Sequence, residues 1–206
     1  MHQTDRQKLI DNWLHDFFNH SNYQFYLLTG DASFRKYFRV ETQDAMSGIS
    51  KTYILMDAPP DKEPIAPFIA STQILKQKSI SVPTIHHQDQ NNGLLLLDDF
   101  GDKTLLTALN SQNAENYYSK AIRVICDIQK LPAQPQLPIF NTSELSREFN
   151  LFEEWFLLKL AKQSQIDLQP EYDYLIEKCL EQPYTVTHRD FHSRNIMILD
   201  GGALGI

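Results

Sequence analysis

The sequence is poor in cysteine, in excess positive charge and in long apolar runs, and each shortage excludes a class of protein. Two cysteines in 206 residues cannot form the disulfide framework of a small secreted domain. Nineteen Lys and Arg against 26 Asp and Glu give a formal net charge of −7, which argues against a protein that coats nucleic acid. The longest wholly apolar runs, Leu94–Leu97 among them, have four residues, far fewer than the about 20 that cross a bilayer.

The remaining composition is that of an ordinary globular protein, with 42% hydrophobic and 22% charged residues. A chain of this length forms one domain, or two small lobes that share a cleft. Residues 1–8 are polar and mixed in charge, so no secretory signal is visible. We therefore expect a cytoplasmic protein with no nucleic acid, no membrane and no obligate protein partner.

The first half of the chain predicts one helix followed mainly by strands. Apolar residues at helical spacing predict an amphipathic helix at the N-terminus, and the pattern changes to alternation at Tyr23. Asn91-Asn92-Gly93 is typical of a tight turn between two strands. The expected elements are a helix over 4–20, strands over 23–29, 34–42 and 51–56, a helix over 65–77, and strands over 84–87 and 94–97.

The second half predicts helices. Asn141, followed three residues later by Glu144, is typical of a capping box at the start of a helix. The expected helices cover 105–110, 114–130, 141–162 and 171–181, and the β-branched residues of 184–187 predict a strand. The class is thus α+β, with a strand-rich lobe over 1–97, a linker over 98–102 and a helical lobe over 103–206.

The residues that indicate chemistry lie close together near the end of the chain. Asp190 and Asn195 stand at opposite ends of one loop, which the predicted strand 184–187 would deliver. Phosphoryl transfer needs a carboxylate beside the attacking hydroxyl and oxygen ligands for Mg²⁺ nearby, and these two residues supply both. His188 would anchor the loop by hydrogen bonding, and Arg194 could meet a phosphate or a substrate carboxylate.

The spacing of His188, Asp190 and Asn195 resembles the H-x-D-x-x-x-x-N catalytic loop of protein-kinase-like phosphotransferases. The form His-Arg-Asp-Phe-His is similar to the small-molecule branch, the aminoglycoside-phosphotransferase-like kinases. This resemblance implies a bilobal protein-kinase-like fold with an antiparallel-sheet, nucleotide-binding N-terminal lobe. The helical C-terminal lobe would carry the catalytic loop 188–195 and would be truncated in this chain.

A second feature, the turn between the first two strands, fits phosphate binding. Gly30 and its small or polar neighbours Asp31, Ala32 and Ser33 allow backbone N–H groups to approach a phosphate closely. The Ser33 hydroxyl could add a further hydrogen bond, and Arg35 lies close enough in sequence to supply a positive charge. We expect these residues to bind the phosphates of a nucleotide.

The kinase pattern is broken at the third strand, which has no lysine where the phosphate-binding lysine is usual. The following helix, 65–77, has no glutamate to pair with such a lysine, and Glu63 precedes it. Because both halves of the ion pair are missing together, we interpret this as a replacement. Arg35, Lys36 and Arg39 are the candidates, and strand alternation puts Lys36 on the face opposite to the two arginines.

A more specific resemblance combines four segments, 30–39, 56–60, 97–102 and 188–195. Together they are similar to the anomeric N-acetylmuramate/N-acetylglucosamine kinases of bacterial cell-wall recycling. The resemblance implies ATP and Mg²⁺ as cofactors and phosphorylation of the C1 hydroxyl of an amino sugar. Asp190 would be the base, Asn195 a Mg²⁺ ligand, and the linker residues Asp98, Asp99 and Phe100 would hold adenine through their backbone.

One residue expected from the resemblance is missing from this chain. The family's second metal ligand is an aspartate about 13 residues after Asn195, which would fall past Ile206. We therefore expect the N-terminal portion of a longer kinase, with little activity alone.

Two alternatives to the amino-sugar kinase stay open at this stage. The acceptor could instead be an aminoglycoside, a choline-like compound or another metabolite alcohol. The missing lysine and aspartate also allow a non-catalytic, nucleotide-binding regulatory protein.

Overall fold

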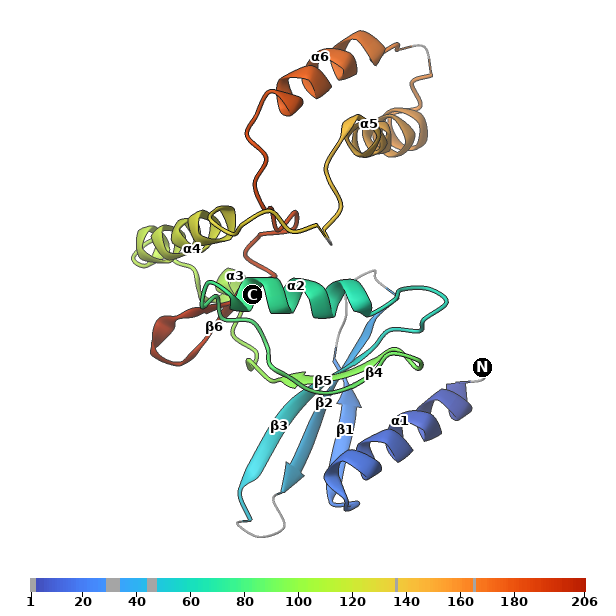
Figure 1. The fold of residues 1–206 in the computed structure, drawn as a ribbon, viewed down its shortest axis with the longest axis vertical. Helices are drawn as coiled ribbons and strands as arrows, with labels where there is room; N and C mark the ends of the chain where they lie inside the picture. The colour runs from blue at the N-terminus through green and yellow to red at the C-terminus, as the bar shows by residue number, and fades with distance from the viewer. Residues whose placement is uncertain (1–2, 29–33, 44–47, 136, 165) are drawn as a thin grey trace. The chain divides into compact units, whose positions relative to one another are not determined.

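The computed structural model describes residues 3–28, 34–43, 48–135, 137–164 and 166–206 (Figure 1). The chain divides into two compact units, Met1–Leu131 together with Thr187–Ile206, and Pro132–Val186. Within the described ranges, no helix is long and apolar enough to cross a bilayer. The lobe boundaries expected from the sequence remain a prediction.

The first unit is built around one antiparallel sheet of five strands. Its strand order is β1-β2-β3-β5-β4, so the antiparallel sheet expected in the N-terminal part is confirmed. The register places Tyr37 opposite Met56, and Ile54 opposite both Arg39 and Leu97. The strands are β1 (Tyr23–Leu27), β2 (Lys36–Gln43), β3 (Ser50–Asp57), β4 (Ile85–Asp89) and β5 (Leu94–Asp98).

Two helices cover opposite faces of this sheet, α1 (Gln3–Phe18) and α2 (Ala66–Lys76) (Figure 1). Strand β5 consists of four leucines followed by Asp98, and its leucines pack on both faces of the sheet because successive side chains of a strand point to opposite faces. Leu94 and Leu96 pack in the cluster that includes α1, whereas Leu95 and Leu97 pack in the cluster that includes α2. This double burial explains why β5 has no polar residue before Asp98.

The turn between β4 and β5 approaches the end of β3 closely. Gly93 has a φ of +67°, which disfavours residues with a Cβ. Its carbonyl oxygen accepts a hydrogen bond from the Ala58 N–H at 2.9 Å. A Cβ at Gly93 would lie 1.9 Å from the Ala58 carbonyl oxygen, so the glycine is required by contact as well as by conformation.

The rest of the first unit supports the last residues of the chain. Helices α3 (Leu105–Ala108) and α4 (Ala114–Gln129) pack against a two-stranded ribbon of β6 (Met197–Ile198) and β7 (Leu204–Gly205). A 3₁₀ turn, η2 (Asp200–Gly202), joins the two strands. The buried residues of this small core are Leu105, Ala121, Ile196, Ile198 and Leu204.

The second unit contains α5 (Thr142–Leu151), the π-helix η1 (Phe152–Leu160) and α6 (Gln169–Leu180). The predicted start of α5 is confirmed, because the Asn141 side chain accepts a hydrogen bond from the Glu144 N–H. Phe149 of α5 stacks on Tyr172 of α6 with ring centroids 5.4 Å apart.

Most of the large apolar side chains of η1 are exposed. Leu157 is buried, but Trp155 is 59% exposed and Phe156 is 46% exposed. The last helix of this unit, α6, contributes only Tyr172 and Ile176 as buried residues. One short helix cannot cover apolar side chains that surround η1 on several sides.

The strand predicted over 184–187 is wrong. These residues pair with no strand among the described residues and have no regular secondary structure. Their β-branched composition favours an extended chain, but a strand also requires a neighbour with which to share hydrogen bonds. His188 and Asp190 therefore follow a segment without regular secondary structure.

Candidate active site

The loop 188–195 brings its two most informative side chains together. The Asn195 amide nitrogen Nδ2 donates a hydrogen bond to Asp190 Oδ2 at 2.6 Å and another to the Asp190 carbonyl oxygen at 3.1 Å. On the other side of the carboxylate, His192 Nε2 lies 3.1 Å from Asp190 Oδ1. The Asp190 side chain is 68% exposed, so it is held by two neighbours and still open to a substrate.

The backbone of this loop is fixed by the start of α3. The Leu105 N–H donates to the Ile196 carbonyl at 2.7 Å, and the Leu106 N–H donates to the Ser193 carbonyl at 2.9 Å. Ile196 is 2% exposed and packs on Leu105. The N–H groups at the start of a helix lack partners inside the helix, so they are well suited to hold a neighbouring loop.

The entry to the loop is strained. Arg189, between His188 and Asp190, has a φ of +70°, which is rare for a residue with a long side chain. Such a conformation costs on the order of 1–3 kcal/mol and is found most often at functional sites. The Asp190 N–H donates to His188 Nδ1 at 3.4 Å, so the histidine contacts the backbone two residues further along.

Burial of the His188 ring lowers its pKa below the ordinary value, and His192 adds to the lowering while Asp190 opposes it. The folded protein therefore binds a proton at His188 less readily than the unfolded chain does. Stability is at its full value above the unfolded pKa of about 6.5 and falls as the pH drops toward the lower folded pKa.

We expect His188→Gln to reduce the acid sensitivity of the fold, because glutamine takes up no proton. The free energy of unfolding should fall less in this variant than in the wild type between about pH 7.5 and 5.5. Urea unfolding at both pH values measures the difference, and the other histidines are common to both proteins. An equal loss in the two proteins would show that His188 does not titrate as its burial implies.

Arg194 and the linker were also expected at the site. Arg194 is exposed, and its backbone N–H donates to His192 Nδ1 at 3.3 Å. The Asp98 carboxylate accepts a hydrogen bond from the Thr84 N–H at 2.8 Å and lies 2.7 Å from His86 Nε2. The ring of Phe100 packs so closely on β7 that a Cβ at Gly205 would lie 2.7 Å from it.

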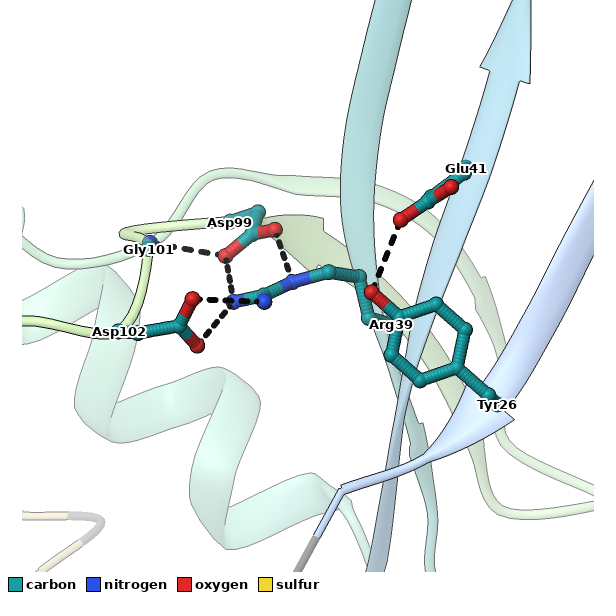
Figure 2. A network of polar contacts seen from close by, with 6 residues as sticks. All are labelled: Tyr26, Arg39, Glu41, Asp99, Gly101 and Asp102. Atoms are coloured by element: carbon teal, nitrogen blue, oxygen red, sulfur yellow. Dashed lines mark hydrogen bonds and ion pairs between the residues drawn. The ribbon is translucent and has the colours of Figure 1, made fainter.

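The strongest polar contact of the linker is with Arg39 of β2 (Figure 2). Arg39 Nε donates to Asp99 Oδ2 at 2.7 Å, and Nη2 donates to Asp99 Oδ1 at 3.1 Å, so the pair is bidentate. The guanidinium also donates to Asp102 at 2.8 and 3.0 Å. Asp99 Oδ1 accepts a further hydrogen bond from the Gly101 N–H at 2.8 Å, so the Asp99 side chain also binds the backbone of the linker itself.

These contacts raise the pKa of Arg39. The hydrogen bonds from its guanidinium to Asp102 and to Asp99 both raise it, and burial of the guanidinium opposes them. The two carboxylates differ greatly in exposure, because the Asp99 side chain is 4% exposed and that of Asp102 is 81% exposed. Breaking a buried ion pair leaves a charge without compensation, whereas water replaces an exposed partner. Asp99 should therefore contribute most of the stabilisation.

We expect Asp99→Asn to lower the free energy of unfolding by about 3 kcal/mol, and Asp102→Asn by less than about 1 kcal/mol. Fluorescence during urea unfolding measures both, in a Trp155→Phe background where Trp13 of α1 is the remaining tryptophan. Trp155 is largely exposed, so its replacement should change little. Equal losses for the two variants would contradict the importance of burial.

The four turn residues Gly30, Asp31, Ala32 and Ser33 lie outside the described residues. Arg35 is described and forms an ion pair with Glu63 at 2.6 Å. Sequence reasoning gave no role to His192, although its place two residues after Asp190 in His-Arg-Asp-Phe-His was the available signal. It also missed Asp102, whose contact with Arg39 depends on how the linker bends.

Asn195 is the described residue that fits a magnesium ion. Its Nδ2 is turned toward Asp190, which leaves the amide oxygen to act as a hard ligand. Among the described residues no group of three or more His, Cys, Asp or Glu could hold a metal.

Comparisons with known proteins agree with this geometry. The model of the phosphotransferase enzyme family matches residues 26–206. N-acetylmuramate/N-acetylglucosamine kinase of Pseudomonas putida is 36% identical over 174 residues, covering 82% of this chain and 50% of that protein. The kinase of the same name from Neisseria meningitidis serogroup B is 33% identical over 206 residues, covering 95% of this chain and 59% of the relative. The chain thus spans little more than half the length of these relatives, and the resemblance seen in its motifs is confirmed.

The fold is similar to that of solved small-molecule kinases. Choline kinase LicA from Streptococcus pneumoniae superposes with a TM-score of 0.64 at 14% identity, over 97% of this chain and 66% of that one. The expected kinase-like fold is therefore confirmed. Because the family model covers all but the first 25 residues, the chain belongs to the phosphotransferase enzyme family.

Proposed function

We propose that this chain is part of an ATP-dependent kinase that phosphorylates the anomeric hydroxyl of N-acetylmuramate or N-acetylglucosamine. The observation that carries the proposal is the 33–36% identity to two kinases named for these sugars. The match to the family model, over residues 26–206, includes the loop 188–195. The 2.6 Å contact between Asp190 and Asn195 supports the same chemistry.

In this proposal Asp190 accepts the proton of the sugar's C1 hydroxyl as the oxygen attacks the γ-phosphorus of ATP. The bond between that phosphorus and the β–γ bridging oxygen breaks, and ADP leaves. One carboxylate oxygen lies against Asn195 and the other against His192, so the group is oriented before the acceptor arrives. Asn195 would hold Mg²⁺ through its amide oxygen. A bound Mg²⁺ neutralises charge that develops on the transferring phosphoryl group.

The nucleotide would bind between the sheet and this loop. The backbone of Asp98, Asp99 and Phe100 would hold adenine, and the turn 30–33 with Arg35 would hold the phosphates. The linker is fixed on both sides in a way that suits this role, by Thr84 and His86 at Asp98 and by Arg39 at Asp99. A fixed linker presents its backbone groups in one orientation, which lowers the entropy lost on binding.

The acceptor is assigned by its chemistry as well as by the relatives. N-acetylmuramate carries a lactyl carboxylate, for which the exposed Arg194 is our candidate partner. A cytoplasmic location is part of the same proposal. Cationic acceptors such as choline or an aminoglycoside would need a carboxylate-lined pocket instead.

Initial rates of ADP formation test the acceptor class, using protein that has the full length of its relatives. We expect turnover with N-acetylmuramate and N-acetylglucosamine, and none above background with choline or kanamycin. Turnover with choline or kanamycin alone would overturn the amino-sugar assignment and leave the kinase chemistry. Binding of ATP without turnover of any of the four would favour a regulatory protein.

A further inference from the structure

We infer that Arg35 and Glu63 together replace the lysine–glutamate ion pair of kinases, with Arg35 binding the α- and β-phosphates and Glu63 holding it in place. In protein kinases a strand lysine binds these phosphates, and a glutamate of the next helix positions it. The inference rests on the proposed function, since it assigns the residues that bind the nucleotide's phosphates.

Strand β3 supplies no cation on the face that α2 covers, where Ile54 and Met56 lie. Met56, on the face of β3 that α2 covers, is fully buried in an apolar cluster with Ile69 and Leu95. An ammonium group there would lose its hydration without a partner. The whole of α2, Ala66–Lys76, contains no acidic residue, so the helix offers no carboxylate for a cation on the sheet.

Arg35 lies on the correct face of the sheet. Tyr37 of β2 packs in the α2 cluster, whereas Phe38 and Val40 pack in the α1 cluster, so odd-numbered positions of β2 face α2. Arg35 directly precedes β2, and Lys36 pairs with Asp57 at the end of β3. Met56 pairs with Tyr37, and Arg35 lies two positions before Tyr37 on the same face. A side chain as long as that of arginine can reach across this distance.

Glu63 connects this arginine to the start of α2. Arg35 Nη2 lies 2.6 Å from Glu63 Oε1, and Glu63 precedes the first helical residue, Ala66, by three positions. The Arg35 guanidinium carbon also lies 5.8 Å from the ring centroid of Phe68 in α2. The ion pair therefore joins the residue that precedes β2 to the loop that precedes α2. In kinases the lysine–glutamate pair joins a strand to a helix, so both positions are shifted just outside these elements here.

The pair is open enough to meet a ligand. The Arg35 and Glu63 side chains are 24% and 30% exposed, so the contact is neither sealed in the core nor fully solvated. A guanidinium has five N–H donors in a planar fork, enough to hold a carboxylate and a phosphate at once. An ammonium has three, which makes arginine a suitable substitute at this shifted position.

The other two cations proposed for this role are placed elsewhere. Arg39 faces α2, but its guanidinium is engaged with Asp99 and Asp102 of the linker, as Figure 2 shows. Lys36 is exposed and falls on the α1 face by alternation. Of the three candidates, Arg35 alone is held by a carboxylate next to α2.

A comparison of ligands with and without phosphates tests this inference, in protein that has the full length of its relatives. Calorimetric titration would give the dissociation constants of ATP, ADP and adenosine with Mg²⁺ present. We expect Arg35→Met to weaken ATP and ADP at least about tenfold and to leave adenosine within about twofold. Glu63→Gln should weaken ATP by a smaller factor, about threefold to tenfold, because the arginine remains but is no longer held by a charge.

Lys36→Met is the matched control, because it removes a neighbouring cation from the opposite face and should leave all three ligands unchanged. The inference is overturned if Arg35→Met binds ATP like the wild type, or if it loses ATP and adenosine by the same factor, which would indicate a purely structural role. A wild-type chain that binds neither ATP nor adenosine would instead overturn the proposed function, and the inference with it.

Discussion

Replacing Asp190 with alanine is expected to lower turnover about a thousandfold or more while the affinity for ATP stays within about twofold. The carboxylate touches Asn195 and His192 and is otherwise open to the acceptor, so its loss removes the base without removing the nucleotide's contacts. Turnover with saturating sugar and calorimetric titration of ATP measure the two quantities, in protein with the full length of its relatives.

Two further variants separate the base from the shape of the loop. Asp190→Asn keeps the size of the side chain and an oxygen for Asn195, but it cannot accept a proton at neutral pH, so it should be nearly as inactive. Asp200→Ala removes an exposed carboxylate in η2 and should leave turnover unchanged. A loss of less than about tenfold in Asp190→Ala would show that Asp190 is not the base.

Gly93→Ala is expected to lower the free energy of unfolding by about 3 kcal/mol or more, although it adds only one methyl group. The new Cβ would lie 1.9 Å from the Ala58 carbonyl oxygen. Ala58 directly follows β3 and is fully buried. Because the Cβ is fixed to the backbone and its neighbour is a backbone carbonyl, no flexible side chain can move aside to relieve the contact. The sheet must shift, or the turn must open.

Gly48→Ala is a close control for this prediction. Gly48 has the same φ of +67°, but a Cβ there would meet nothing within 4 Å. Its substitution should cost only the conformational preference, about 1 kcal/mol. Urea unfolding followed by Trp13 fluorescence, with Trp155 replaced by phenylalanine, compares the two. If the two variants differ by less than about 1 kcal/mol, the contact with Ala58 is not as rigid as the structure indicates.

The elements of the sheet were predictable because their signals are local. The Asn91-Asn92-Gly93 turn fixes a hairpin by the conformations that asparagine and glycine adopt. The all-leucine strand Leu94–Leu97 indicated burial on both faces, and two helices cover those faces. The spacing of Asp190 and Asn195 predicted that one loop would carry both, and the structure places them in contact.

What sequence reasoning missed depends on partners far along the chain. Residues 184–187 have strand-like composition, but no pattern within them says whether a neighbouring strand exists. The strand alternation of Arg35 and Arg39 was readable, yet their separate partners were not. Arg39 reaches Asp99, 60 residues later, and Arg35 reaches Glu63 in a loop that has no regular structure of its own.

The most direct test of the central proposal is ³¹P NMR of Mg·ATP with N-acetylmuramate or N-acetylglucosamine, in protein with the full length of its relatives. The proposal predicts a new sugar-1-phosphate signal coupled to the anomeric proton, formed together with ADP and absent in Asp190→Ala. ATP that remains intact with both sugars, or a phosphate carried by another hydroxyl, would contradict it.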